Sequence, residues 1–266
     1  GMRAILVLFL TKALLFDKVF ASQVYGSYTG LVYLTPLLGG YIADRYWGNN
    51  RSIIAGGLVM AIGEFVLFFC GEFYQNPEIS SMLFYVGLGC MIAGNGFFKP
   101  NISSMVGQLY KDNDPRRDAG FSLFYAGVNL GALIGGYICI AVANGNLWAS
   151  LVPEALRWNY AFGFAAIVMV ISLLTFTQTQ KSLGEIGLSP LLNIENSKRK
   201  LYEVLTYIGS LAIIPIIIMM VANTVYTDYF MMIIGPASIV YLFYEMRNFS
   251  SSENKKLLAA LVFIIF

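Results

Sequence analysis

The residue in this sequence that is best placed for chemistry is Lys99. It lies in the segment 94–101, GNGFFKPN, far from either end of a long apolar run. A lysine at the centre of a membrane-spanning helix costs about 2.5–3.5 kcal/mol on insertion scales, so it is expected to face a polar interior and to have a partner. We interpret Lys99 as a functional cation. The alternative is a structural lysine that pairs permanently with a carboxylate of another helix.

Arg3 and Glu64 are two further charged residues beside or within apolar runs. Arg3 stands at the start of the run 4–10, where it is either a flanking anchor or a functional cation. Glu64 lies in the middle of the run 59–69. It is either a protonatable coupling group or a neutral, hydrogen-bonded carboxylic acid in a helix contact, and the sequence alone favours the second interpretation.

A third set of candidate residues lies at positions 121, 125 and 129. Phe121, Tyr125 and Asn129 recur every fourth residue and therefore share one face of a helix. Tyr125 and Asn129 present hydrogen-bonding groups from this face. They serve either a ligand or a neighbouring helix, since polar side chains commonly join helices in membranes.

The elements that must position these residues are membrane-spanning helices. Of the 266 residues, 58% are hydrophobic and only 12% are charged, whereas a soluble domain carries about 25% charged residues. This excludes an ordinary cytosolic domain. The apolar runs are long enough to cross a hydrocarbon core of roughly 30 Å. Helices are predicted because open sheet edges cannot face lipid.

Glycine, proline and charge clusters divide the sequence into seven predicted complete spans and a partial span at each end. The complete spans are 24–43, 52–72, 82–105, 118–141, 158–178, 203–222 and 229–246, and the partial ones are 3–16 and 257–266. Most of the 17 Lys and Arg residues fall in the loops on one side of this arrangement. The positive-inside rule places those loops in the cytoplasm.

The most polar part of the sequence is predicted to be a cytoplasmic linker at 181–202. It contains the basic run Lys198-Arg199-Lys200, which we interpret as an anchor in the headgroup region. The linker separates a transmembrane bundle at 1–180, whose first helix is expected to be truncated, from a helical pair at 203–247.

Several kinds of site are excluded by composition. There is no histidine, which excludes a Ser-His-Asp triad, a His-ligated metal and a histidine proton relay within this sequence. The cysteines Cys70, Cys90 and Cys139 are scattered singly in apolar runs without metal-ligand spacing. The net charge of +2 implies no nucleic-acid partner.

Spaced motifs resemble a known family. Residues 39–51, GGYIADRYWGNNR, resemble the signature loop between the second and third helices of the major facilitator superfamily. Residues 94–101, 114–122 (DPRRDAGFS) and 124–131 (FYAGVNLG) resemble the proton-dependent oligopeptide transporters, the POT or PTR2 peptide transporter family. The resemblance covers nearly the whole chain, although 203–246 matches in arrangement more than in motif.

The resemblance implies an all-α polytopic membrane protein of two six-helix bundles, with substrate bound between them. This chain would carry the N-terminal bundle. The pair at 203–247 would be an additional insertion between the bundles, and 257–266 the truncated start of the C-terminal bundle. The Glu-x-x-Glu-Arg motif that the family usually carries on its first helix, just before the position at which this sequence starts, is absent from it, so the coupling carboxylates are not assigned.

The resemblance also implies roles for individual residues. By matching position, Arg3 and Lys99 would form a positive patch for the substrate carboxylate, a charge-assisted contact. Tyr33 would line the pocket, and Asn129, with Tyr125 beside it, would bind the peptide backbone or amino group.

A second implied set consists of Gly40, Asp44, Arg45 and Pro100, which would act in conformational change. Asp44 and Arg45 would hold the outward-open arrangement through contacts between the bundles.

The expected function is proton-coupled symport of di- and tripeptides across the cell membrane by alternating access. Small peptides, protons, the lipid bilayer and the C-terminal bundle of the same protein are the expected partners, with no cofactor besides the coupling proton and no enzymatic activity. The alternatives are a transporter of another small anion such as nitrate, a membrane-embedded transferase or hydrolase, and a non-transporting sensor.

Overall fold

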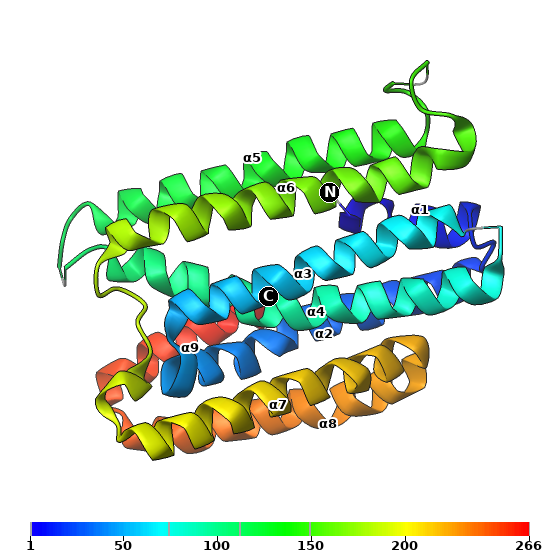
Figure 1. Cartoon of the computed structure of the whole chain (residues 1–266). Coiled ribbons are helices and arrows are strands. Elements are labelled where there is room, and N and C mark those ends of the chain that lie inside the picture. Colours follow the sequence, from blue (N-terminus) through cyan, green and yellow to red (C-terminus); the bar gives the residue numbers. More distant parts are fainter. Residues whose placement is uncertain (1, 74, 112, 149, 266) are drawn as a thin grey trace. The chain divides into compact units, whose positions relative to one another are not determined.

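A computed structural model of the chain describes residues 2–73, 75–111, 113–148 and 150–265, without the side chains of 193 and 260–265. The described residues form long α-helices joined by short connections (Figure 1). In chain order these helices are α1 (Met2–Lys12), α2 (Lys18–Ile42), α3 (Gly48–Glu72), α4 (Pro77–Gln108), α5 (Arg117–Ala143), α6 (Arg157–Thr179), α7 (Asn196–Ala222), α8 (Thr224–Glu245) and α9 (Ser251–Ile265).

Short helices lie between them. A π-helical segment, η1 (Ala43–Trp47), joins α2 to α3. The 3-10 helices are η2 (Glu154–Leu156), η3 (Gln180–Leu183), η4 (Pro190–Asn193) and η5 (Met246–Asn248). The all-helical fold class predicted from the sequence is therefore confirmed for the described residues.

The helices extend beyond most of the predicted spans. Only the apolar part of a helix is visible as a hydrophobic run, whereas its polar ends continue outside the hydrocarbon. The largest difference is in α7, which begins at Asn196 rather than at 203 because the basic run Lys198-Arg199-Lys200 is already helical. The first helix is shorter than predicted: α1 ends at Lys12 rather than at 16.

Within the described ranges, six helical segments are long and apolar enough to cross a membrane. One of them, Lys18–Glu72, has 55 residues and contains both α2 and α3. At 1.5 Å per residue, about 20 residues already span the hydrocarbon core, so this segment holds two crossings. The chain changes direction at Gly48, whose φ of 72° favours glycine. A Cβ there would also collide with the backbone of Leu188.

The helices belong to two compact units. The first ends at Thr224 and contains α1 to α7, and the second begins at Val225 and contains nearly all of α8, together with η5 and α9. All of the residues predicted to bind substrate or to act in conformational change lie in the first unit.

Close backbone contact joins the central helices of the first unit. A Cβ on Gly56 would lie 2.6 Å from the Gly94 carbonyl oxygen, and a Cβ on Gly63 would lie 2.8 Å from that of Gly87. These glycines set α3 directly against α4, which is the most extensive helix contact in this unit. Small residues permit such approach where lipid supplies no hydrophobic driving force.

Aromatic packing fixes α1 in the same unit. Phe9 is fully buried, and its ring lies 5.3 Å from Trp158, 5.2 Å from Phe162 and 6.0 Å from Phe84. Edge-on aromatic pairs of this kind add roughly 0.5–1.5 kcal/mol each beyond buried area. The short helix that carries Arg3 is therefore anchored through Phe9.

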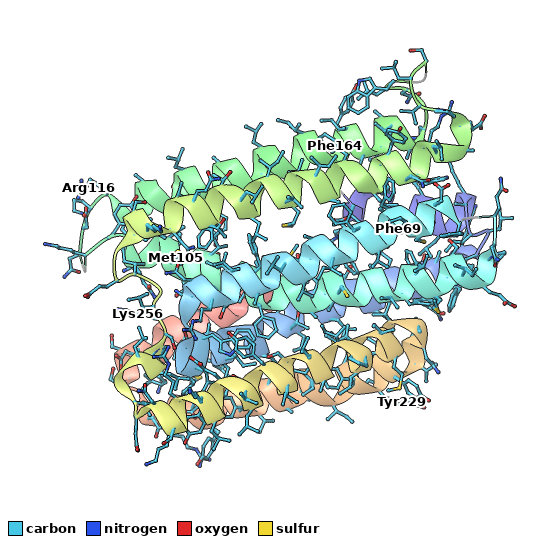
Figure 2. All side chains as sticks on the ribbon, viewed as in Figure 1. Phe69, Met105, Arg116, Phe164, Tyr229 and Lys256 are labelled. Carbon is cyan, nitrogen blue, oxygen red and sulfur yellow. The ribbon has the colours of Figure 1, made fainter. Side chains whose placement is uncertain are left out.

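Many large apolar side chains point away from the first unit. Phe69 on α3 is 52% exposed and projects from the ribbon in Figure 2, whereas Phe162 on α6 is fully buried. Exposed apolar residues are abundant along α5 and α6 as well. Such a surface suits a bilayer or a further bundle rather than water.

Candidate substrate-binding face

Lys99 and Tyr33 meet on the surface of the first unit. Lys99 lies on α4 and Tyr33 on α2, and the Lys99 Nζ stands 4.9 Å from the centre of the Tyr33 ring. This is a cation–π contact. None of the ion pairs among the described residues includes Lys99. The structure therefore does not support a permanent pairing of Lys99 with a carboxylate of this part of the protein.

Arg3 is bound to tyrosines of α2. Its Nε donates to the Tyr25 hydroxyl at 3.0 Å, and the guanidinium carbon lies 5.5 Å from the centre of the Tyr25 ring. Tyr33 makes a further polar interaction with Arg3. Because Tyr33 contacts both cations, it links Arg3 to Lys99.

Polar contacts between α2 and α4 fix the helices beneath this pair. Asn95 Nδ2 donates to the Val32 carbonyl oxygen at 3.1 Å, and Thr35 Oγ1 donates to the Ile92 carbonyl oxygen at 3.2 Å. Because side chains of each helix are bonded to the backbone of the other, the two helices cannot slide without breaking hydrogen bonds. The spacing of Lys99 and Tyr33 is therefore set by the scaffold.

Pro100 adds a backbone contact to the same interface. It lies inside α4 and cannot donate to the carbonyl of Gly96, four residues earlier. That carbonyl oxygen faces α2, where a Cβ on Gly39 would overlap it. Pro100 cannot supply the usual hydrogen bond to the Gly96 carbonyl. Because Gly39 has no side chain, this carbonyl can approach α2 at that position.

Tyr125 and Asn129 lie on α5, and both are exposed. Tyr125 stacks on Phe121 at 6.4 Å and meets Phe124 edge-on at 5.2 Å. No contact joins either residue to Lys99 or Arg3 among those described. A Cβ on Gly131, on the side of α5 opposite Asn129, would also meet nothing within 4 Å, so α5 is open on that side as well.

We call the exposed set Arg3, Tyr33, Lys99, Tyr125 and Asn129 the polar face. It lies on α1, α2, α4 and α5 of one compact unit. Lys99 is exposed on α4, a helix long enough to span a membrane, and a cation there is costly against lipid, so its side chain is expected to border a polar space. Such a space can bind an anionic or zwitterionic ligand through charge-assisted contacts.

The residues predicted to act in conformational change are divided between two places. Gly40 and Pro100 lie together, since a Cβ on Gly40 would be 3.9 Å from the Pro100 Cβ. Asp44 and Arg45 lie in η1 and are exposed, and the Arg45 guanidinium stands 5.6 Å from the Tyr41 ring. Neither charge forms an ion pair among the described residues.

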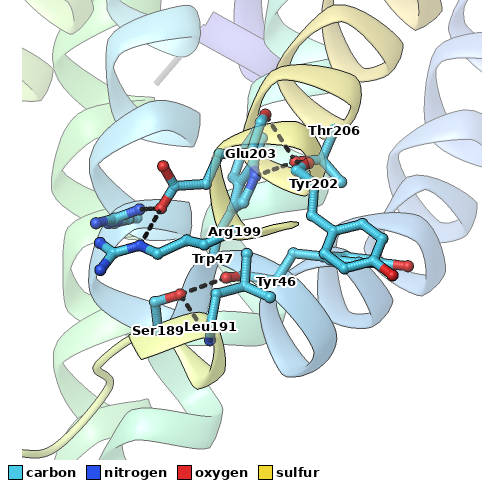
Figure 3. A network of polar contacts seen from close by, with 9 residues as sticks. Tyr46, Trp47, Ser189, Leu191, Arg199, Tyr202, Glu203 and Thr206 are labelled. Carbon is cyan, nitrogen blue, oxygen red and sulfur yellow. Dashed lines mark hydrogen bonds and ion pairs between the residues drawn. The ribbon is translucent and has the colours of Figure 1, made fainter. Parts of the chain in front are cut away.

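The sequence did not reveal the network that η1 actually forms (Figure 3). The Trp47 Nε1 donates to Thr206 Oγ1 of α7 at 2.8 Å, and the Trp47 ring stacks between Phe97 at 5.1 Å and Tyr207 at 4.7 Å. Trp47 is only 2% exposed. The indole is thus a buried joint between α4 and α7.

Ion pairs and a linker contact extend this network. Glu203 Oε1 accepts from Arg51 Nη1 at 2.6 Å and from Arg199 Nε at 3.1 Å. Ser189 Oγ donates to the Tyr46 carbonyl oxygen at 2.5 Å. We call this set the η1–α7 network; its members are Tyr46, Trp47, Arg51, Ser189, Arg199, Glu203 and Thr206.

The connection between α4 and α5 carries its own ion pair. Arg116 Nη2 lies 2.8 Å from Asp114 Oδ2, and the Arg116 backbone N–H donates to Asp114 Oδ1 at 2.9 Å. The Arg116 side chain and backbone together lower the pKa of the Asp114 carboxyl to about 2. This carboxylate is therefore charged at any physiological pH.

No cluster of His, Cys, Asp and Glu able to hold a metal ion occurs within the described ranges. The polar face carries cations, an amide and phenols, with no nucleophile held next to a base. This arrangement can bind and orient a charged solute.

Comparison with known proteins identifies the family to which this chain is similar. Residues 50–265 match the family model PTR2, described as the POT family. The di-/tripeptide transporter of Lactococcus lactis subsp. lactis (strain IL1403) is 32% identical over 275 residues, a match that covers 97% of this chain and 52% of that protein. The uncharacterized transporter YclF of Bacillus subtilis (strain 168) is 35% identical over 233 residues, covering 85% of this chain and 43% of that protein.

Solved structures show the same fold. A POT family transporter in complex with a thioalcohol-conjugated peptide has a TM-score of 0.75 at 27% identity, and the match covers all of this chain and 53% of that one. A peptide transporter POT in complex with sulfate has a TM-score of 0.71 at 28% identity, with 98% and 52% covered. This chain spans about half the length of the relatives it matches.

Proposed function

This chain belongs to the POT family, a family of multi-pass membrane transporters and not of enzymes, and on this premise we propose that it forms the N-terminal half of a proton-coupled symporter of di- and tripeptides. Peptide transport is supported by the Lactococcus lactis relative, named a di-/tripeptide transporter.

The observation that carries the proposal is the position of Lys99 on the polar face. A cation in the middle of α4, exposed and without an ion pair among the described residues, needs an anion that comes and goes. The carboxylate of a peptide meets that requirement. Arg3 adds a second positive charge, bridged to Lys99 through Tyr33.

The remaining residues complete the proposed binding mode. Tyr33 lines the pocket, and Asn129 and Tyr125 bind the backbone or amino group of the peptide from α5. A C-terminal bundle of the same protein supplies the acidic side that a zwitterionic peptide requires, and binding between two bundles permits alternating access.

Conformational change is assigned to the ends and kinks of the same helices. Gly40 and Pro100 sit where α2 meets α4, and Asp44 and Arg45 remain exposed for contacts with the second bundle. We place the protein in the cell membrane with the basic loops, including 181–202, in the cytoplasm. The pair at 203–247 and the segment 257–266 then correspond to an insertion between bundles and the start of the C-terminal bundle.

The test is uptake of a labelled dipeptide into proteoliposomes that contain the full-length transporter, with a proton gradient directed inward. We expect accumulation that unlabelled dipeptides inhibit and nitrate does not. Inhibition by nitrate alone would instead favour a small-anion transporter, and binding without uptake would favour a sensor.

The role of Lys99 is tested by Lys99→Ala in the same assay. Loss of a charge-assisted contact costs about 1.5–3 kcal/mol, so KM should rise at least roughly tenfold. Lys18→Ala is the matched control, because Lys18 is an exposed lysine at the start of α2, away from the polar face. Unchanged uptake by Lys99→Ala would remove the assigned role.

A further inference from the structure

A cavity of about 300 Å³ lies among the helices of the first unit, in addition to the polar face. All six helices from α1 to α6 contribute to its lining. Its polar members include Arg3, Tyr28, Glu64 and Ser172, and much of the remainder is methionine and glycine. A space of this size is roomy enough for several water molecules, since one water needs about 30 Å³ of liquid volume.

Glu64 is the residue in this lining that the proposed function does not use. It lies in the middle of α3 and is 3% exposed. Its Oε2 atom is buried without a hydrogen-bond partner in the described part of the chain. An ionised carboxylate in such surroundings is costly, whereas the neutral acid is tolerated. These surroundings therefore favour the neutral form of Glu64 over the ionised one.

The titratable groups that share the cavity come from three helices. They are Arg3 from α1, Tyr28 from α2 and Cys139 from α5; the lining residues from α4 and α6, such as Met91 and Ser172, are not titratable in this range. Among the described residues of this lining, Arg3 is the only cation. Its Nε is bonded to Tyr25, and its terminal nitrogens carry further donors.

Two other polar side chains of α3 differ from Glu64 because they are hydrogen-bonded, one buried (Ser52) and one exposed (Glu72). Ser52 Oγ donates to the Gly48 carbonyl oxygen at 2.8 Å, and Glu72 Oε2 accepts from Asn159 Nδ2 at 2.6 Å. A carboxylic acid that merely joins helices should show such a bond. Glu64 Oε2 shows none among the described residues and borders a cavity with an arginine.

We propose that Glu64 is a proton-binding site of the transport cycle. In the state described here its carboxyl is protonated. When water fills the cavity, the O–H bond of the acid breaks, the proton passes to that water, and the carboxylate pairs with Arg3 across the cavity. Reprotonation releases Arg3. This inference rests on the proposed function, and it names a carboxyl within this chain for the coupling ion.

The experiment compares coupled and uncoupled transport in proteoliposomes that contain the full-length protein. Counterflow of labelled against unlabelled peptide requires no net proton movement, whereas accumulation under a proton gradient does. We expect Glu64→Gln to keep counterflow but to lose accumulation, so that the internal peptide concentration only equals the external one. Glu64→Asp should restore accumulation with a shifted pH dependence.

Glu72→Gln is the matched control, because it neutralises a second carboxylate of α3 that is already hydrogen-bonded. It should accumulate peptide as the wild type does. Accumulation by Glu64→Gln at the wild-type level would overturn the proposal.

A second readout does not depend on transport. Infrared difference spectra of the purified wild-type protein at two pH values should show the carbonyl band of a protonated carboxyl that disappears on titration. This band should be absent from Glu64→Gln and displaced in Glu64→Asp. A wild-type spectrum without any titrating carboxyl band would overturn the proposal. Wild-type protein that shows the band but no counterflow would instead contradict the proposed peptide transport.

Discussion

The polar face and the η1–α7 network use similar residue types in opposite ways. Both combine cations with aromatic rings, Lys99 over Tyr33 in one and Arg51 beside the Trp47 stack in the other. In the network each charge has a carboxylate partner and the indole is buried. On the polar face the charges are exposed and lack carboxylate partners among the described residues. We interpret the paired charges as a structural contact between helices and the unpaired charges of the polar face as part of the proposed binding site.

The largest expected effect is a loss of stability in the η1–α7 network. Trp47→Ala removes a fully packed indole between Phe97 and Tyr207 and should lower stability by about 3–5 kcal/mol, the usual cost of deleting a buried aromatic side chain. The melting temperature of the detergent-solubilised protein measures this. Trp148→Ala is the control, because Trp148 is 44% exposed. Equal destabilisation by both variants would show that Trp47 is not a joint.

A smaller change in the same place separates stacking from hydrogen bonding. Thr206→Val keeps the volume but removes the acceptor of the Trp47 Nε1 donor. A buried donor left unsatisfied costs about 1–3 kcal/mol, so the melting temperature should fall less than in Trp47→Ala. In Trp47→Ala the same Thr206→Val change should cost little more, because no donor remains to be orphaned. Additive losses would contradict this interpretation.

On the polar face the expected change is in transport rather than stability. Tyr33→Leu removes the ring beneath Lys99, and an exposed cation–π contact contributes about 0.5–1 kcal/mol, so KM should rise roughly twofold to fivefold. Tyr33→Phe keeps the ring and should retain most of the affinity. The melting temperature should change in neither variant. A loss of stability would show that Tyr33 also holds helices together, and the polar face would then not differ from the η1–α7 network in this respect.

The smallest effect is expected at Asp114. Because Arg116 lowers its pKa to about 2, the paired carboxylate contributes stability above its ordinary pKa near 4. That contribution is lost as the pH falls toward 2. The melting temperature of Asp114→Asn should therefore lie slightly and constantly below that of the wild type from pH 8 to about 5. The two should converge in stronger acid. A difference that grows on acidification would contradict this sign.

Much of the fold could be predicted because a helix that crosses a lipid bilayer needs about 20 consecutive apolar residues. Long apolar runs located α2 to α8, whereas the close backbone approach of Gly94 to Gly56 and of Gly96 to Gly39 comes from the structure. The ends of the helices were less visible, since polar helical turns such as 196–202 resemble a linker in composition. The predicted linker is also attached to η1, because the Ser189 hydroxyl donates to the Tyr46 carbonyl oxygen.

The polar face was partly visible in the sequence, and the η1–α7 network was not. Lys99 stands out because a lone charge in an apolar run needs a local explanation. Trp47 and Thr206 are separated by 159 positions, and neither is unusual where it stands. Only the fold brings them together. The one available signal was a tryptophan between charged residues and Gly48 in the loop after α2, which suggests a bulky side chain that must be buried somewhere.

The backbone contact between Gly39 and Gly96 has a consequence for how this protein diversifies. The helices that carry Tyr33 and Lys99 are held together by the Gly39–Gly96 approach and by hydrogen bonds from Asn95 and Thr35 to main-chain carbonyls, none of which uses a residue of the polar face. Exchanges at the polar face therefore leave the register of α2 and α4 intact. Single substitutions on the polar face can therefore change the proposed substrate preference without changing how α2 packs against α4.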